Sequence, residues 1–213
     1  MKKVIILLMT CLMSLSMQAQ EEHLKFMGIP MGGSLKDFHQ ELVEKGLKRT
    51  IKLDTGWQYE GIFAGYESTI QVLYTAKSRL VKGVGVSIKC YSEANMETIS
   101  ESLNNSIKSK YEKDPGVQLF LKFYEMYKDS VSKELLETFQ WIRNVNTGDG
   151  TEYVVYIIPR PTKEAIDNKL GLISVGKKIG INPVTYIKEY LVEIIYSDDK
   201  TSHEGIKEIE DDL

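Results

Sequence analysis

Two adjacent carboxylates near the end of the chain are the first residues that could do chemistry. Asp198 and Asp199 follow Tyr186–Tyr196, whose β-branched and aromatic residues predict a strand. Paired carboxyl groups can divide general acid and general base roles between them. Successive side chains of a strand point to opposite faces, however, so these two would not meet on one substrate. We therefore predict that both are solvated residues at a strand end.

The three histidines do not have the spacing of a metal site. His23 and His203 lie near the ends of the chain, and His39 lies between Asp37 and Glu41 in a predicted helix. Zinc is bound by several His, Cys or carboxylate ligands at short, characteristic spacings. We therefore predict a solvated helix face for His39, and neither a metal ion nor a cofactor for the chain.

Two glycine-rich segments also lack the residues of a reactive loop. Ser34 follows Gly32–Gly33, but Lys36 stands where a nucleophile elbow needs a glycine. Asp37, three residues after Ser34, instead makes Ser34 a helix N-cap. Asp149, between two glycines, is a single acidic residue where calcium needs about six to eight oxygen ligands. We predict a turn there and no catalytic residue in the chain.

The elements that would position these groups follow from periodicity and turn residues. Gly46 is placed to end the first helix in the left-handed conformation, and Gly61 and Gly65 suggest a bulge or a close backbone approach. Gly83 and Gly85 favour curvature of their strand. The predicted strands are Leu24–Ile29, Leu47–Leu53, Trp57–Tyr66, Thr69–Thr75, Leu80–Tyr91, Thr138–Asn144, Glu152–Ile158 and Tyr186–Tyr196. The predicted helices begin at Leu35 and span Asn95–Tyr111, Val117–Glu137 and Thr162–Leu170, with a break near Ser130 as an alternative for the third. Gly171–Pro183 is predicted as loop, with a short strand as the alternative.

This order predicts an α+β fold, with a mostly antiparallel sheet and helices packed on one face. Residues 20–199 are expected to form a single domain, and residues 200–213 a flexible acidic tail. The length suits one hydrophobic core better than two. We find no internal repeat at the level of residues.

The start of the chain predicts export. Met1–Ala19 has a basic start, an apolar run over Val4–Leu15 and a polar exit, which is typical of a signal peptide. The apolar run is shorter than the roughly 20 residues of a membrane span, and we expect no transmembrane segment after cleavage. Leu8–Cys11 is an alternative, degenerate lipobox, but Thr10 fits that motif poorly and we do not expect a lipid anchor at Cys11.

Charge and cysteine content exclude further classes. The formal net charge is −3 and the Lys and Arg residues are scattered, whereas nucleic-acid binding needs clustered positive charge. After cleavage of the signal peptide only Cys90 remains, so no intramolecular disulfide is possible. Cys90 lies in an apolar alternating run, and we predict a buried, inert thiol.

The number of tyrosines is high for a chain of this length. The chain has 12 tyrosines, and tyrosine on a partly exposed sheet face is typical of recognition surfaces. Packing in the core explains most of the aromatic residues. The candidates for a partner-binding surface are Trp57, Tyr59, Tyr66 and Trp141.

One group of proteins shares several of these residues. The chain resembles the opening of uncharacterised exported proteins of Gram-negative gut bacteria, whose pattern is F-x-G-I-P-x-x-G-S followed by an F-x-x-x-L-x-x-K-G helix. It departs from that group at Glu112–Asp114, where the group has a shorter turn. The order of elements is also loosely similar to the β-lactamase-inhibitor-protein and outer-membrane assembly lipoprotein folds, which bind other proteins. The matching residues are Phe26, Gly28, Ile29, Pro30, Gly33, Ser34, Phe38, Leu42, Lys45 and Gly46, with Lys110–Tyr111, Trp141 and Ile195–Asp198 further on.

We therefore expect an exported, non-enzymatic binding module in the periplasm or at the cell surface of a Gram-negative bacterium. Its partner is an unidentified protein or small ligand. Two alternatives remain open: a cell-envelope hydrolase whose carboxylates meet only in the fold, and a small-ligand carrier. A pocket with convergent acids would favour the hydrolase.

Overall fold

The computed structural model describes residues 23–53, 56–130, 132–133, 137, 140–147, 151–159, 169–182 and 184–210. The predicted signal peptide lies outside these residues. Most of the predicted helix Thr162–Leu170 also lies outside them, and its last two residues belong to a strand.

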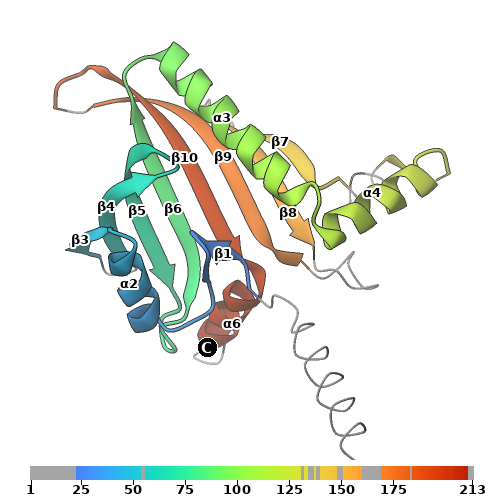
Figure 1. Ribbon diagram of the computed structural model, residues 1–213, viewed down its shortest axis with the longest axis horizontal. Coiled ribbons are helices and arrows are strands. Elements are labelled where there is room, and N and C mark those ends of the chain that lie inside the picture. The colour runs from blue at the N-terminus through green and yellow to red at the C-terminus, as the bar shows by residue number, and fades with distance from the viewer. Residues whose placement is uncertain are drawn as a thin grey trace, which may run out of the picture.

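Eight antiparallel strands form one continuous sheet (Figure 1). The strands are β3 (Lys48–Lys52), β4 (Gly56–Phe63), β5 (Tyr66–Tyr74), β6 (Val81–Cys90), β7 (Ile142–Asn146), β8 (Glu152–Pro159), β9 (Lys169–Ile181) and β10 (Lys188–Asp198). Their order across the sheet is β3-β4-β5-β6-β10-β9-β8-β7. The predicted α+β class and the meander of the first half are confirmed.

The two halves of the sheet repeat one arrangement. Each half is a meander of four strands preceded by helix, and the last strands of the halves, β6 and β10, pair with each other. This pairing is antiparallel and runs from Tyr190 opposite Cys90 to Ser197 opposite Gly83. The strand order is therefore symmetric about the centre of the sheet. The repeat is one of topology, which explains why the residues themselves do not reveal it.

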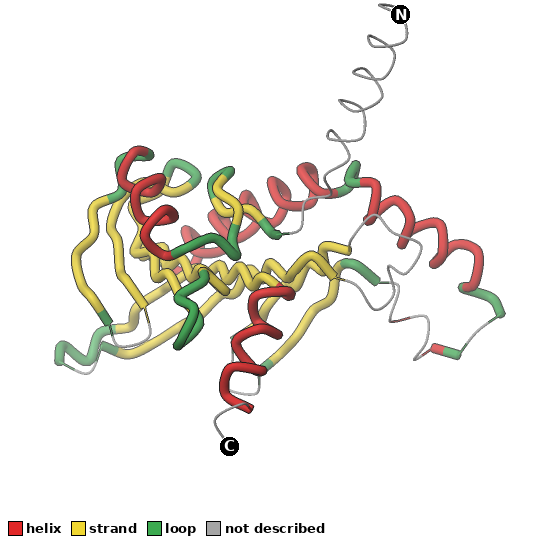
Figure 2. The backbone as a smooth tube through the Cα atoms, turned by 90° about the horizontal axis from the view of Figure 1, so that it is seen from below, coloured by secondary structure: helices red, strands yellow, loops and turns green. Residues whose placement is uncertain are grey.

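Helices α2 (Leu35–Glu44) and α3 (Glu93–Tyr111) lie on one side of the sheet, and α4 (Pro115–Tyr127) runs outward past its β8 edge (Figure 2). The Oγ of Ser34 accepts a hydrogen bond from the backbone N–H of Asp37 at 3.2 Å, so the predicted N-cap of α2 is confirmed. Gly46 has φ +89°, as predicted for the residue that ends this helix. Helix α4 ends at Tyr127, before the predicted Glu137 and close to the alternative break near Ser130.

The core lies between these helices and the sheet. A small hairpin of β1 (Lys25–Phe26) and β2 (Ile29–Pro30) replaces the single strand predicted there. It inserts Phe26, whose ring stacks on Phe63 at 5.4 Å and meets Tyr196 edge-on at 5.2 Å. The other core residues include Val84, Val86 and Ile88 of β6, Val192 and Ile194 of β10, and Met96, Ile99, Leu103 and Ile107 of α3.

Two predictions that rested on glycines are confirmed only in part. Strand β9 occupies most of the segment predicted as loop with a short strand. Glycine is needed in β9 because a Cβ at Gly171 would clash with the carbonyl oxygen of Ser197, and one at Gly176 with the ring of Tyr153. Of the two glycines predicted to mark a bulge or a close approach, Gly61 lies so close to Leu47 that a Cβ would clash with it, whereas Gly65 is the second residue of a tight turn between β4 and β5 and has φ +89°.

Most of the segment predicted as a flexible tail belongs to a helix, α6 (Asp199–Glu210). Asp198, the last residue of β10, directly precedes this helix and is 0 % exposed, so the predicted solvation of its side chain is incorrect. Its carboxylate accepts hydrogen bonds from Leu24 N–H at 2.8 Å, Thr201 N–H at 3.1 Å and Thr201 Oγ at 2.7 Å, and lies 2.9 Å from His23 Nδ1. One buried side chain thus joins the two ends of the described fold.

Replacement of Asp198 tests this junction. We expect Asp198→Asn to lower the free energy of unfolding by about 2–4 kcal/mol, because an amide leaves some of these buried donors without an acceptor. Asp199→Asn, one residue further on, is the control and should cost less than about 1 kcal/mol. Equal losses for the two variants in urea titrations would show that Asp198 does not stabilise the fold in this way.

Candidate binding surface

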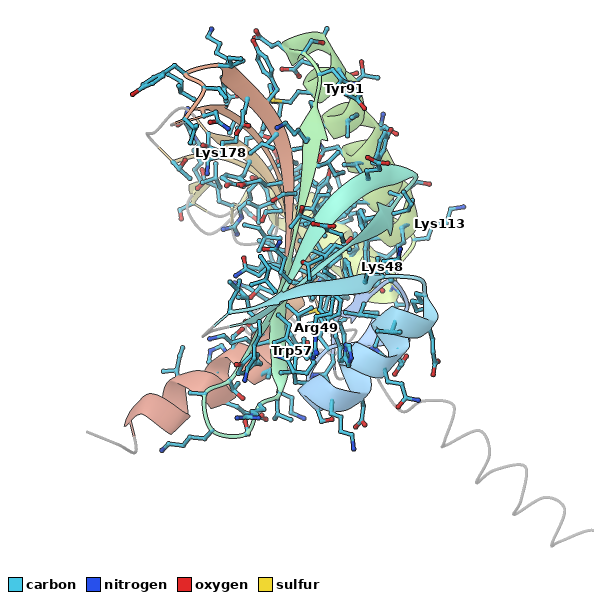
Figure 3. The ribbon with its side chains drawn as sticks, turned by 90° about the vertical axis from the view of Figure 1, so that its left-hand side faces the viewer. Lys48, Arg49, Trp57, Tyr91, Lys113 and Lys178 are labelled. Carbon is cyan, nitrogen blue, oxygen red and sulfur yellow. The ribbon has the colours of Figure 1, made fainter. Side chains whose placement is uncertain are left out.

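Among the described elements, α6 alone lies on the side of the sheet opposite α2 and α3, and it is confined to one end. In Figure 3 these helices lie on one side of the sheet, and α6 projects from the lower end on the other side. We call this second side the open face. One row of its side chains crosses all eight strands in register: Ile51, Gln58, Gln71, Gly85, Ile195, Ser174, Val155 and Arg143. The next row is Lys48, Glu60, Thr69, Ser87, Glu193, Gly176, Tyr153 and Val145.

The centre of the open face is hollowed over β6. At this place β6 carries Gly85, which has no side chain, and Ser87, whose side chain is small. A hollow of about 340 Å³ lies over Gly85, and a Cβ added at this glycine would find no atom within 4 Å. The hollow is lined by Gln58, Thr69, Gln71, Leu73, Gly85, Val86, Ser87, Glu193, Ile194 and Ile195.

The hollow combines apolar walls with polar groups. Leu73 and Ile195 supply apolar walls, and amides, hydroxyls and the carboxylate of Glu193 supply hydrogen-bonding groups. Glu193 is held in place because it accepts a hydrogen bond from the hydroxyl of Tyr153 at 3.1 Å and lies 3.8 Å from Lys178 Nζ. Such a mixture of fixed polar and apolar groups is typical of surfaces that bind other proteins.

The aromatic residues predicted from the sequence do not form this surface. Tyr59 is 0 % exposed and Trp141 is 6 % exposed, so both are core residues. Trp57 and Tyr66 are partly exposed, but they pack against the core on the helix side. The four candidates therefore do not form one exposed surface. Alternation along a strand groups residues by face, but it does not tell which face the helices cover.

His39 is not the solvated residue predicted from its acidic neighbours. Its Nδ1 lies 3.0 Å from the hydroxyl of Tyr59, and its ring meets Trp57 edge-on at 5.0 Å. Burial, and then the nearby charge of Arg49, lower the pKa of His39 below its usual value. An imidazole hydrogen-bonded to a buried phenol therefore joins α2 to the sheet. This is a packing role, since the phenol that it meets is enclosed in the core.

A polar cleft of about 550 Å³ lies between α3 and strands β7 to β9. Lys177 Nζ lies 2.9 Å from Glu97 Oε1 and 4.0 Å from Glu152 Oε2, so two acids converge there as the hydrolase alternative requires. General acid catalysis uses a carboxyl group that burial keeps protonated, but the side chains of Glu97 and Glu152 are 46 % and 67 % exposed. Asn104, Asn144 and Asn146 also line the cleft. This arrangement suits hydrogen bonding to a ligand better than proton transfer.

Other side chains that could take part in a reaction stabilise the fold instead. Asp198 and His23 form an acid–imidazole pair, but the carboxylate also binds Leu24 and Thr201. Cys90 is buried as predicted, and burial raises the pKa of its thiol. Across the ranges that the structure describes, no group of three or more His, Cys, Asp or Glu side chains could hold a metal ion.

Comparison with known proteins identifies no relative of this chain. No protein-family model, curated protein or solved structure matches the chain. The resemblance to exported proteins of gut bacteria therefore stays a prediction. Of the helices in the described ranges, none combines the length and apolar character needed to cross a membrane.

Alkaline unfolding tests the burial of Tyr59. Burial raises the pKa of its phenol from 10.0 to about 12. Because the folded state holds this proton more tightly, the stabilisation is complete below about pH 10 and is lost as the pH rises toward about 12. We expect the free energy of unfolding in urea to fall over this range, and to fall less steeply in Tyr59→Phe. Tyr91→Phe, which removes an exposed phenol, is the control; an equal change of slope in both variants would contradict the assignment.

Proposed function

We propose that this protein is an exported, non-enzymatic module that binds another protein through the open face. The observation that carries the proposal is the sheet itself, whose helices cover one side and leave a hollowed, chemically mixed surface on the other. The predicted signal peptide Met1–Ala19 supports export. The resemblance to exported proteins of Gram-negative bacteria supports the periplasm or the cell surface as the location.

The open face is large enough for a specific interface. Eight strands about 4.8 Å apart give a width of roughly 34 Å. The six inner strands, of 8 to 13 residues, are roughly 27 Å long or more at about 3.4 Å per residue. The resulting area is on the order of 900 Å², and a stable interface buries about 800 Å² on each partner.

The hollow over Gly85 gives this surface a place for a protruding side chain. Binding energy concentrates where an anchor residue fills a pocket from which water is excluded. Leu73 and Ile195 would contact the apolar part of such an anchor, and Gln71 and Glu193 its polar end. A partner side chain with an apolar stem and a hydrogen-bonding tip fits this lining.

A second candidate function is small-ligand carriage in the cleft beside α3. Its volume of about 550 Å³ lies within the range of about 300–1,000 Å³ for small-ligand sites. The three asparagine amides can both donate and accept hydrogen bonds. If the protein carries a ligand there, native mass spectrometry of protein purified from the cell envelope will show bound mass, and Asn144→Leu will reduce its occupancy at least fivefold. Protein free of bound mass, or occupancy unchanged in Asn144→Leu, would rule out this second function.

Filling the hollow tests the main proposal. We expect Gly85→Leu to reduce recovery of the partner from envelope extract at least tenfold, because the new side chain occupies the space of the anchor and overpacking costs about 1–3 kcal/mol. The substitution should leave the fold intact, since a Cβ at Gly85 meets no atom within 4 Å. Urea titration checks that stability is unchanged.

Gly180→Leu is the matched control. Gly180 also lies in a strand, and a Cβ there also meets no atom within 4 Å, but this glycine is outside the lining of the hollow. Recovery of the partner should be unchanged in this variant. If Gly85→Leu recovers as much partner as the unmodified chain does, the open face is not the binding surface.

A further inference from the structure

The hairpin of β9 and β10 ends in a group of exposed apolar side chains. We call Ile179, Ile181, Val184, Tyr186 and Ile187 the hairpin tip; they are 49 %, 66 %, 84 %, 82 % and 65 % exposed. Single exposed apolar residues are ordinary on protein surfaces, but a contiguous group marks a site of interaction. The tip stands at the end of the sheet opposite α6 (Figure 1), so it can be buried without covering the rest of the molecule.

The tip is held in shape by Asn182. Its Oδ1 accepts hydrogen bonds from the N–H groups of Val184 at 2.9 Å and Thr185 at 3.0 Å, and its Nδ2 donates to Glu189 at 3.1 Å. Its backbone carbonyl accepts from Tyr186 N–H at 2.8 Å. The exposed side chains are therefore presented by an ordered turn, and little conformational entropy is lost when they are buried.

Charged and aromatic residues lie beside the apolar ones and on their sheet side. Lys188 pairs with Ile181 across the hairpin, and Lys178 precedes Ile179, with its Nζ 3.8 Å from Glu193 Oε1. Tyr91, 95 % exposed, follows Cys90 on the neighbouring strand. Figure 3 shows Tyr91 and Lys178 near this end of the molecule. Lys188 is exposed and makes no ion pair with any described residue. Lys89 contributes a further amine, although it binds Glu189 at 3.0 Å.

This gradation matches the layers of a membrane surface. Aliphatic side chains enter the boundary of the acyl chains, tyrosine prefers the headgroup level, and lysine amines reach the lipid phosphates. From Lys178 to Ile181 the strand rises roughly 10 Å, which is similar to the depth of about 5–10 Å that interfacial elements reach. A pocket in a partner protein would bury the apolar tip equally well, but it would not require the surrounding lysines.

We propose that the hairpin tip inserts into the headgroup region of a membrane that contains anionic lipid. The contact holds the protein at the membrane surface through one hairpin. The open face is not covered by this contact and stays free to bind its partner. The tip and the open face are therefore separate sites, and a substitution can abolish binding by one of them without affecting the other.

Flotation of the full mature chain with lipid vesicles tests this inference. We expect the protein to bind vesicles of phosphatidylethanolamine and phosphatidylglycerol, and Ile181→Asp combined with Ile187→Asp to reduce the bound fraction at least tenfold. Val43→Asp changes an aliphatic residue of 48 % exposure on α2 and should bind as the unmodified chain does. Lys188→Glu should reduce binding severalfold, with a smaller reduction at high salt.

Other results of these experiments would contradict membrane insertion, or would distinguish its failure from a failure of the proposed function. Absence of binding to anionic vesicles, or equal binding by the tip variant, would overturn the proposal. Loss of partner recovery in the tip variant without any vesicle binding would assign the tip to a protein interface instead. Gly85→Leu should still bind vesicles, so a failure of the open-face proposal leaves this result unchanged.

Discussion

The pairing of β6 with β10 is the interaction on which the rest of the structure depends. It joins two meanders into one sheet, from the Tyr190–Cys90 pair to the Ser197–Gly83 pair. Side chains of both strands on the helix side are buried in one core with α3. On the other side the same two strands carry Gly85, Ser87 and Ile195, which form the centre of the open face. One junction therefore supplies both the stability of the fold and its hollowed surface.

Local signals in the sequence predicted those elements that local interactions determine. Ser34 and Asp37 marked the start of α2 because a cap is a contact over three residues. The full length of strand β9 was not predicted, because the need for glycine at positions 171 and 176 comes from Ser197 and Tyr153, on neighbouring strands. The burial of Asp198 was missed for the same reason, since its partner Leu24 is 174 residues away.

The candidate site was harder to predict than the fold. Large aromatic residues such as Tyr59 and Trp141 suggested a recognition surface, but their size favours burial and they lie in the core. The surface is instead marked by small residues, Gly85 and Ser87, in a central strand where β-branched residues are favoured. At Gly85 the missing side chain leaves space on one face open, whereas at Gly176 a neighbouring ring fills it. The sequence alone does not distinguish these two cases.

The central claim is that contact through the open face is what this protein does, and site-specific photo-crosslinking in growing cells tests it most directly. A photoreactive residue would be placed at Ile195 on the open face, at Glu101 in the cleft beside α3, and at Val43 on α2. We predict a discrete adduct with one protein from Ile195, and none from Glu101 or Val43. Protein adducts from Glu101 or Val43 without one from Ile195 would contradict the account.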